Sequence, residues 1–274
     1  MTAQVIHGEA WEDYTKSRAL GSSALAAWGT MSLAQWSAEY LESDAYDDEP
    51  STTAGAKEGG DYLDARITGN KPLDSFAVKP EGMSFSNKDG KAWRDLHTGK
   101  TLITEAQKRE VDSAVPFVRE ALRVLAQGCE VSYQVTLRGE IAGLAVQTRP
   151  DCWIDTPDAL EIPDIKYVGQ IDKFDRDWVG GRYEIQSALA YSLARAAGIT
   201  KRINARFLLV ESGTENPRTQ VVRIPQEVIV LAVARLEARC AEIIAVRDSG
   251  LGFVDVVDFR DIALPGWAMQ RLEA

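Results

Sequence analysis

Carboxylates and one lysine lie within or beside apolar runs in the middle of the chain. Asp151 stands in TRPDCW, Asp164 and Lys166 stand in EIPDIKYV, and Glu130 precedes VSYQVTL. Residues i and i+2 of a strand point to the same face, so we expect Asp164 to project with Lys166, and Arg149 with Asp151. Two carboxylates on neighbouring strands can share a Mg²⁺ ion together with water and a substrate phosphate. A nearby ammonium can orient an attacking water or help to deprotonate it, which suits metal-assisted hydrolysis of a phosphodiester.

The setting of these residues makes the pattern more specific than any single motif in it. Asp151 and Asp164 each follow a proline, and proline in a strand favours an edge or a bulge that can re-aim a side chain. A lone Asp-x-Lys is usually structural, and Asp151 alone is compatible with a surface turn. A helix that carries Tyr183 and Gln186 follows, and residues three apart share a helix face.

Hydrophobic periodicity predicts the elements that must hold these residues. We expect helices over 19–42, 61–67, from near 104 to 128, 177–197 and 225–248, and strands over 131–137, 144–154, 159–168, 206–211 and 220–224. Ser22 or Ser23 is expected to cap the first helix, and Thr104-x-x-Gln107 makes a capping box. Pro116 is expected to kink or divide the helix that follows. Residues 43–60 and 70–100 are expected to be irregular, and 138–140 to form a turn.

This order of elements favours an α/β (α+β) fold with a central mixed sheet flanked by helices. The 274 residues suit a single domain, 1–274, with an N-terminal helical and loop part (1–104), a catalytic core (105–248) and a tail (249–274). An apolar share of 45% allows a sizeable core.

Composition excludes several classes of site. Three scattered cysteines argue against a disulfide framework, a CxxC metal clip and a four-cysteine iron–sulfur cluster, and two histidines argue against a His-rich zinc site. The chain shows no apolar run of 18 residues and no signal-peptide pattern, so we expect no membrane partner and a cytoplasmic location.

The net charge of −10 is concentrated in one segment. Residues 39–64 hold nine acidic residues and one lysine, so the remainder of the chain is close to neutral. The acidic segment is either a solvated loop or a region with metal or partner chemistry. Lys88, Lys91, Arg94 and Lys100, with Trp93 among them, form either another solvated loop or a surface that follows DNA.

The motifs together resemble the PDDEXK nuclease superfamily, and within it the branch of RecE and the phage lambda exonuclease. RPD at 149–151 and DIK at 164–166 match its signature. GSSAL at 21–25, GKAWRDLHTGKTLIT at 90–104 and YEIQSALAY at 183–191 match further blocks of that branch, in the same order. The matching blocks span about residues 20 to 195.

The resemblance implies roles for individual residues. Asp151 and Asp164 would bind Mg²⁺, or Mn²⁺ in its place, with the carbonyl of Ile165 as a further ligand, and Lys166 would position the water. Glu130 would bind a second metal or the water, and Gln186 would hold water or phosphate. Ser22 or Ser23 would contact DNA phosphate. Tyr183 would face DNA. Arg149 is either a structural ion-pair partner or a phosphate clamp.

One motif departs from the family pattern. RecE-like proteins carry a metal-binding histidine in the stretch that corresponds to GDYLD at 60–64, and here Asp64 takes that place. A carboxylate is an acceptable ligand for Mg²⁺. An alternative is that the two stretches do not correspond.

The resemblance implies a Mg²⁺-dependent exonuclease that digests linear double-stranded DNA from 5′ to 3′ in recombination. It also implies a homo-oligomeric ring, a trimer or tetramer, around DNA ends, with a single-strand annealing protein as partner. Two alternatives stay open. One is an exonuclease of the RecB or CRISPR-associated type with another polarity. The other is a degenerate nuclease fold that only binds DNA or protein.

Overall fold

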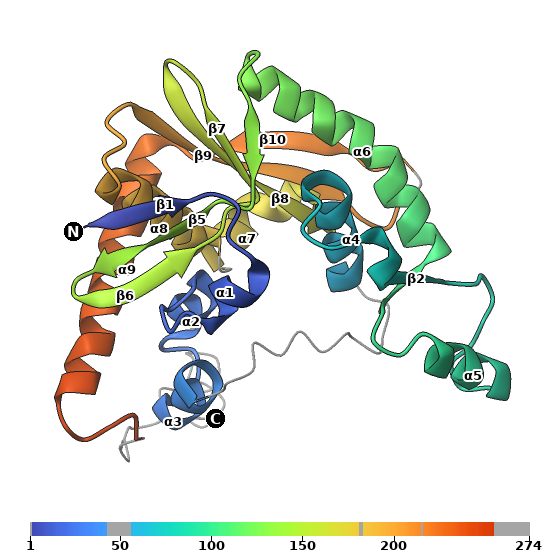
Figure 1. Ribbon diagram of the computed structural model, residues 1–274, viewed down its shortest axis with the longest axis horizontal. Helices are drawn as coiled ribbons and strands as arrows, with labels where there is room; N and C mark the ends of the chain where they lie inside the picture. Colours follow the sequence, from blue (N-terminus) through green and yellow to red (C-terminus); the bar gives the residue numbers. More distant parts are fainter. Residues whose placement is uncertain (1, 43–55, 181–182, 215, 255–274) are drawn as a thin grey trace, which may run out of the picture.

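The computed structural model describes residues 2–42, 56–180, 183–214 and 216–254. A larger mixed sheet and a smaller antiparallel sheet, with the helices around them, make up its body (Figure 1). The larger sheet has the strand order β10-β9-β8-β7-β4, and a smaller one has the order β1-β5-β6. The strands are β1 (Ala3–Ile6), β2 (Phe76–Lys79), β3 (Thr101–Thr104), β4 (Val131–Tyr133), β5 (Thr136–Ile141), β6 (Leu144–Thr148), β7 (Cys152–Asp155), β8 (Ala159–Val168), β9 (Arg202–Glu211) and β10 (Thr219–Arg223).

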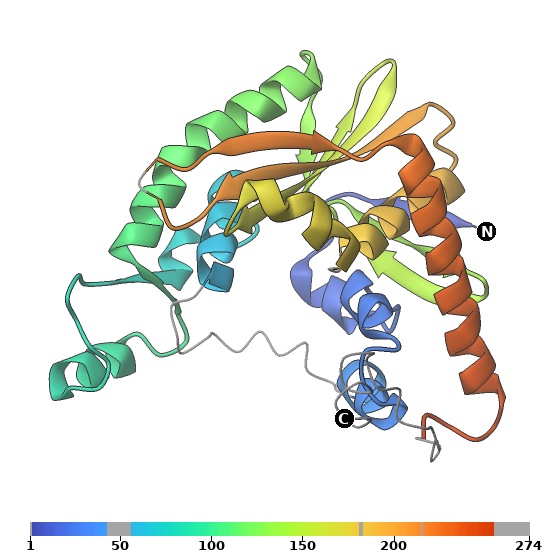
Figure 2. The same cartoon turned by 180° about the vertical axis from the view of Figure 1, so that it is seen from behind.

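Helices cover both faces of the larger sheet (Figures 1 and 2). They are α1 (Trp11–Lys16), α2 (Ser22–Ala27), α3 (Leu33–Ser37), α4 (Ala56–Thr68), α5 (Lys88–Leu96), α6 (Glu105–Ala126), α7 (Phe174–Gly180), α8 (Tyr183–Ala196) and α9 (Gln226–Asp248), with a π-helical turn at Ala38–Glu42 and 3₁₀ turns at Leu73–Ser75 and Ile171–Lys173. The expectation of a mixed α/β fold with a central mixed sheet flanked by helices is confirmed.

Strand β8 is the central strand of the larger sheet. It pairs with β9 in parallel along its whole length, from Ala159 to Val168, but it pairs with β7 only near its start, at Leu160 and Glu161. Pro163 therefore stands in a central strand, just past the point where β7 leaves it. A proline there removes no ladder hydrogen bond on that side. In the described part of the structure, the second half of β8 therefore has no strand paired with it on the β7 side.

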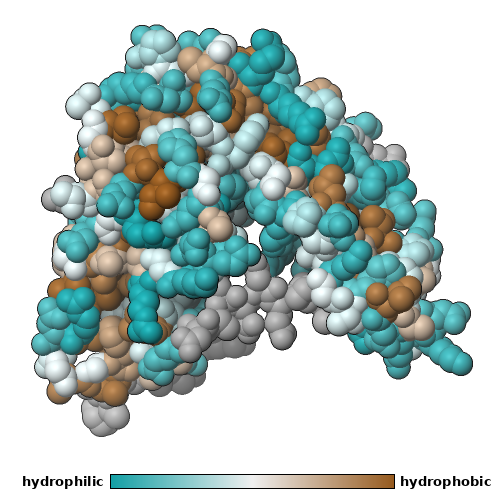
Figure 3. Space-filling view, viewed as in Figure 1, coloured by the Kyte–Doolittle hydropathy of each residue, from teal (hydrophilic) through white to brown (hydrophobic). Residues whose placement is uncertain are grey.

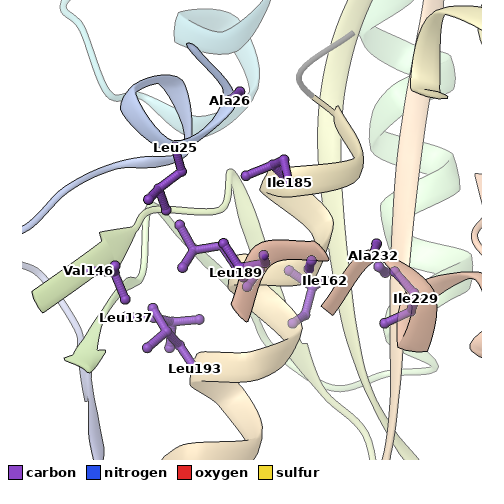
Figure 4. Packing of buried hydrophobic residues seen from close by; sticks show 14 of the residues in the cluster. Leu25, Ala26, Leu137, Val146, Ile162, Ile185, Leu189, Leu193, Ile229 and Ala232 are labelled. Atoms are coloured by element: carbon purple, nitrogen blue, oxygen red, sulfur yellow. The ribbon is translucent and has the colours of Figure 1, made fainter. Parts of the chain in front are cut away.

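Alternate residues of β8 and β9 face two separate cores. Ile162 and Phe207 belong to the core that lies against α2, α8 and α9, and Figure 4 shows Ile162 there with Leu25 and Leu189. Ile165 and Leu208 belong to the second core, which lies under α4 and α6. The two-residue period of a strand produces this division. It places the side chains of even-numbered residues 164 and 166 on the α8 face.

The single helix expected over 19–42 is wrong. The chain forms α2, a left-handed residue at Gly29, then α3 with a capping box between Ser32 and Gln35, and the π-helical turn. The N-cap of α2 is Gly21, which has no side chain to accept a hydrogen bond from the first turn, so neither Ser22 nor Ser23 is the cap. Both serines lie inside the first turn.

The segments on either side of α4 also differ from expectation. The helix expected over 61–67 is present but begins at Ala56, so residues 56–60 of the expected loop are helical; residues 43–55 lie outside the described residues. The stretch 70–100 is not irregular, since it contains β2 and α5. Strand β2 pairs in parallel with β3.

The capping box at Thr104 and Gln107 is confirmed, with hydrogen bonds of 2.8 and 3.1 Å between their side chains and backbone amides. Pro116 does not divide the helix, because α6 is continuous through it while Val111, Val115 and Val118 are buried along one side. The helix ends as expected before Gly128, whose positive φ follows a left-handed Gln127.

Two expected strands are each split. The run 131–137 breaks at Gln134, which has a φ of 53°, into β4 and β5. The run 144–154 breaks at residues 149–151 into β6 and β7. The turn expected at 138–140 is wrong, because these residues pair within β5 and the chain turns instead at Ala142 and Gly143.

The remaining elements follow the prediction closely. The helix expected over 177–197 is present as α7 and α8, and the last two strands are present as β9 and β10. Pro225 is the N-cap of α9, which runs to Asp248. Of the expected tail, residues 255–274 lie outside the described residues. Within the described part of the chain, no helix is both long enough and apolar enough to cross a membrane.

Candidate functional site

The even-numbered residues at the end of β8 meet the start of α8. The carboxylate of Asp164 forms an ion pair with Lys166, and its Oδ1 accepts a hydrogen bond of 2.7 Å from Nε2 of Gln186. Nζ of Lys166 lies 5.4 Å from the ring centroid of Tyr183. The expectation that Asp164 and Lys166 project together is confirmed, and the Tyr-x-x-Gln face of α8 is turned toward them.

Asp151 reaches the same place from outside the sheet. It lies just before β7 rather than within a strand, so the expected shared strand face with Arg149 is wrong. Its Oδ2 accepts a hydrogen bond of 2.7 Å from the backbone N–H of Ile165. The carboxylate thus occupies the side of β8 that β7 has left. Because the N–H and C=O of one strand residue point to the same side, the carbonyl of Ile165 faces this opening as well.

Asp64 approaches from α4, which packs against β8. Its Oδ2 accepts a hydrogen bond from the side-chain amide of Asn70 and lies 3.5 Å from Nε2 of Gln134. The same Gln134 nitrogen lies 3.4 Å from Oδ1 of Asp151. Oδ1 of Asp64 is buried and has no hydrogen-bond partner. One amide therefore bridges two of the three carboxylates.

The electrostatics of these groups are those of a crowded acidic site. Burial raises the pKa of Asp64 to about 6, and the charge of Asp164 adds to this. Burial also raises the pKa of Asp151 well above its ordinary value, with further contributions from Asp164 and Asp64. Burial lowers the pKa of Lys166, but the charges of Asp164 and Asp151 outweigh it and the net pKa is raised. Lys166 is therefore an ammonium at neutral pH, which suits orienting a water better than removing its proton.

Asp64 and Asp151 border an open cavity of about 640 Å³, whereas Asp164 and Lys166 are not among its lining residues. Its walls come from the N-terminal segment, α2, α4, β4 and α8. The lining residues include Trp11, Tyr14, Ser22, Asp61, Asp64, Asn70, Lys71, Gln134, Arg149, Asp151 and Gln186. Of the two serines expected at DNA, Ser22 lines this cavity, whereas Ser23 is exposed and does not line it.

Arg149 joins this wall to the N-terminal segment. Its Nε donates to the carbonyl of Gln134 at 3.0 Å, and its Nη2 donates to the carbonyl of Glu9 at 2.7 Å. The guanidinium lies over the rings of Trp11 and Tyr14, at 5.8 and 5.6 Å from their centroids. Its Nη1 is buried with no hydrogen-bond partner. The side chain therefore holds the wall together in this structure, through backbone carbonyls rather than through a carboxylate.

The structure does not bring Glu130 to the other acids. Glu130 is exposed and precedes β4, in which Tyr133 is the residue that pairs with Cys152, next to Asp151. Glu130 thus lies at the opposite end of β4. The expectation that it shares the site is wrong, because the register of β4 on β7 sets Glu130 at the far end of the strand and it does not line the cavity.

The donor set fits a hard divalent cation in part. Three carboxylates share one lysine, and Oδ1 of Asp64 is a buried oxygen with no partner. Among the described residues, no group of three or more His, Cys, Asp or Glu side chains is arranged so that it could hold a metal ion. Mg²⁺ does not need such a group, because it commonly binds one or two carboxylates and keeps several waters.

Sequence reasoning missed the two amides that hold the carboxylates. The strand breaks at Gln134, but the apolar residues Val131, Tyr133, Val135 and Leu137 alternate without interruption through this position. Nothing in the sequence pattern therefore marks the break. Asn70 follows α4 in a stretch that was expected to be irregular. The aromatic wall of Trp11 and Tyr14 belongs to a helix, α1, that was not predicted.

No protein-family model matches the sequence, and no curated protein matches it. The structure resembles the crystal structure of a Eubacterium rectale protein described as a "putative exonuclease". The TM-score is 0.60, the identity is 17%, and the match covers 95% of this chain and 94% of the other. At that identity, the likeness is one of fold.

Proposed function

We propose that the protein is a Mg²⁺-dependent deoxyribonuclease with a PDDEXK core. The observation that carries this proposal is the meeting of Asp164, Lys166 and Asp151 at the open half of β8, with Gln186 bound to Asp164. The similarity in fold to a protein named for an exonuclease activity supports it.

Asp151 and Asp164 are the proposed metal ligands, and the Ile165 carbonyl and Asp64 are proposed as further donors. A bound Mg²⁺ would polarise the scissile phosphate and lower the pKa of a water. Lys166 donates hydrogen bonds toward the attacking water and offsets negative charge as the phosphate is attacked. Gln186 fixes the orientation of Asp164 through its 2.7 Å hydrogen bond. Ser22, which lines the cavity, and Tyr183, whose ring lies beside Lys166, are proposed to contact the DNA.

The resemblance to RecE and lambda exonuclease makes the proposal more specific. The substrate would be linear double-stranded DNA, digested from 5′ to 3′ in recombination, with Mg²⁺, or Mn²⁺ in its place, as the cofactor. A homo-oligomeric ring, a trimer or tetramer, would hold a chain of net charge −10 on DNA by enclosing it. A single-strand annealing protein would receive the product strand.

The test is digestion of a linear duplex with a different label at each end of one strand. Reactions contain Mg²⁺, Mn²⁺ or a chelator, and compare the unchanged protein with Asp164→Asn. Asp158→Asn is the control, since Asp158 is exposed in the turn between β7 and β8. We expect Mg²⁺-dependent early release of the 5′ label, lost in Asp164→Asn and kept in Asp158→Asn. Early release of the 3′ label would support the RecB or CRISPR-associated type instead. A folded protein that cleaves with neither Mg²⁺ nor Mn²⁺ would be the binding module.

A further inference from the structure

Residues 76–104 form a projection that we call the basic arm. Figures 1 and 2 both place α5 at the outer end of the molecule, away from the two sheets. The base of the arm is the parallel pair β2 and β3, which packs against α4 and α6. Since α4 also carries Asp64, the arm is fixed to an element of the candidate site.

The charge of the arm is opposite to that of the chain. Five cations stand in it, namely Lys79, Lys88, Lys91, Arg94 and Lys100, against the three acids Glu81, Asp89 and Asp95. The arm is therefore net positive by two in a chain of net charge −10. The arm is thus a locally positive segment of an acidic chain.

Four cations of the basic arm, three on α5 and one after it, form no ion pair within the described part of the chain. The side chains of Lys88, Lys91, Arg94 and Lys100 make no ion pair with any residue that the structure describes, whereas Lys108 and Arg123 on α6 are both paired with acids. Lys88, Lys91 and Arg94 recur at intervals of three, so they lie along one side of the helix. Lys88 and Lys91 are exposed. The helix thus presents free cations to solvent.

The arm is held in one shape by its own contacts. The ring of Trp93 stacks on the rings of His97 and Phe85, with centroid distances of 4.1 and 6.2 Å. Nζ of Lys79 lies 5.0 Å from the ring centroid of Phe85. Gly90 is needed where α5 meets the preceding turn, because a Cβ there would lie 2.0 Å from the carbonyl oxygen of Ser84. The ring faces are occupied by one another, so the arm is suited to contacting phosphates rather than to stacking on bases.

We propose that the basic arm is a second contact surface for duplex DNA, binding the phosphate backbone outside the catalytic cavity. Figure 3 shows the molecule hollowed between the arm and the part that holds α2 and α3. A duplex is a rod of regularly spaced negative charge, and an array of unpaired cations on a preformed helix neutralises its phosphates at little cost in ordering. The inference rests on the proposed function, because it assumes that DNA is the substrate of the cavity.

The test is the salt dependence of duplex binding without cleavage. A labelled linear duplex is titrated with protein in chelator at several salt concentrations between about 50 and 200 mM, the range over which phosphate contacts change affinity most visibly. The variant is Lys88→Gln with Lys91→Gln and Arg94→Gln. The matched control removes the same charge elsewhere, as Arg202→Gln with Arg223→Gln and Arg247→Gln, on β9, β10 and α9. A second variant, Lys88→Arg with Lys91→Arg, keeps the charge.

Each phosphate contact contributes about 0.9 to the slope of log affinity against log salt, so the arm variant is expected to lose roughly 1 to 3 from that slope. Its affinity in about 0.1 M salt is expected to fall about tenfold. The control and the arginine variant are expected to keep the slope. An unchanged slope in a folded arm variant, or an equal loss in the control, would overturn the proposal. Mg²⁺-dependent cleavage by the unchanged protein is measured separately, so loss of the arm proposal and loss of the nuclease proposal give different results.

Discussion

The carboxylate of Asp151 accepts the backbone N–H of Ile165 at 2.7 Å, at the point where β7 has stopped pairing with β8. A side chain here does what a neighbouring strand would otherwise do for the backbone. The same contact places a carboxylate beside Asp164, one residue along β8. The site therefore depends on the end of pairing between β7 and β8. Asp151, which accepts the backbone N–H left unpaired there, is one of the proposed metal ligands.

Substitution of Asp151 is expected to separate these two roles. Asp151→Asn keeps an oxygen that can accept the Ile165 N–H, so the protein is expected to remain folded with a similar melting temperature while Mg²⁺-dependent cleavage is lost. Asp151→Ala leaves a buried N–H without a partner, and its free energy of unfolding is expected to fall by about 1–3 kcal/mol. Denaturant unfolding and cleavage assays on both variants check this, with Asp158→Ala as the control. Equal stability of the Asn and Ala variants would show that the hydrogen bond does not support the strand.

Lys166 is expected to stabilise the metal-free protein because it is the cation that the three carboxylates share. Lys166→Met leaves Asp164, Asp151 and Asp64 without it. Breaking a buried pair typically costs about 3–5 kcal/mol. The Lys166 side chain keeps 21% exposure, so we expect a smaller loss of about 1–3 kcal/mol at pH 7. The loss is expected to shrink at pH 5, where the carboxyl groups take up protons. Urea unfolding at both pH values measures it, and an equal loss at both would argue against charge as the cause.

The parts of the site that sequence could predict are those with a regular period. β8 alternates between two cores, so Asp164 and Lys166 were placed correctly on one face, and the helix that follows carries Gln186 to them. Asp151 was assigned to the right neighbourhood but to a strand, because the apolar run from Leu144 to Ile154 continues through its break. Periodicity reports burial, and residues 149–151 remain half-buried or buried although they leave the ladder.

The parts that sequence could not predict depend on long-range packing. Glu130 was grouped with the other acids because it precedes a strand, yet the register of β4 on β7 puts it at the far end. Asp64 reaches the cavity only because α4 packs on β8, which no local pattern encodes. The helix expected over 19–42 failed at Gly29, since small and aromatic residues on both sides of the break are equally apolar.

The pH dependence of stability is expected to follow Asp64. Its pKa is raised to about 6 in the folded protein, above the ordinary value of 3.8 expected for the unfolded chain. The unfolded state therefore releases its proton first as the pH rises, and the free energy of unfolding of the metal-free protein is expected to fall between about pH 4 and pH 7. Asp64→Asn removes this titration and is expected to make the fall shallower, while the raised pKa of Asp151 leaves part of it. Thermal unfolding in chelator from pH 4 to pH 8 measures both proteins, and a variant with an unchanged slope would assign the fall to other carboxyl groups.

Gln134, whose side-chain amide lies between Asp64 and Asp151, is expected to have a strained backbone. Its φ of 53° lies in the left-handed region, which costs a residue with a Cβ about 1 kcal/mol and costs glycine little. Gln134→Gly and Gln134→Ala both remove the amide, but only glycine relieves the backbone. The alanine variant is therefore expected to be less stable than the glycine variant by about 0.5–1 kcal/mol, after allowance for the greater freedom of glycine in the unfolded chain. Urea unfolding of the pair measures this difference. If alanine were the more stable of the two, the left-handed conformation would not be the strained feature of this break, and the separation of β4 from β5 would need another cause.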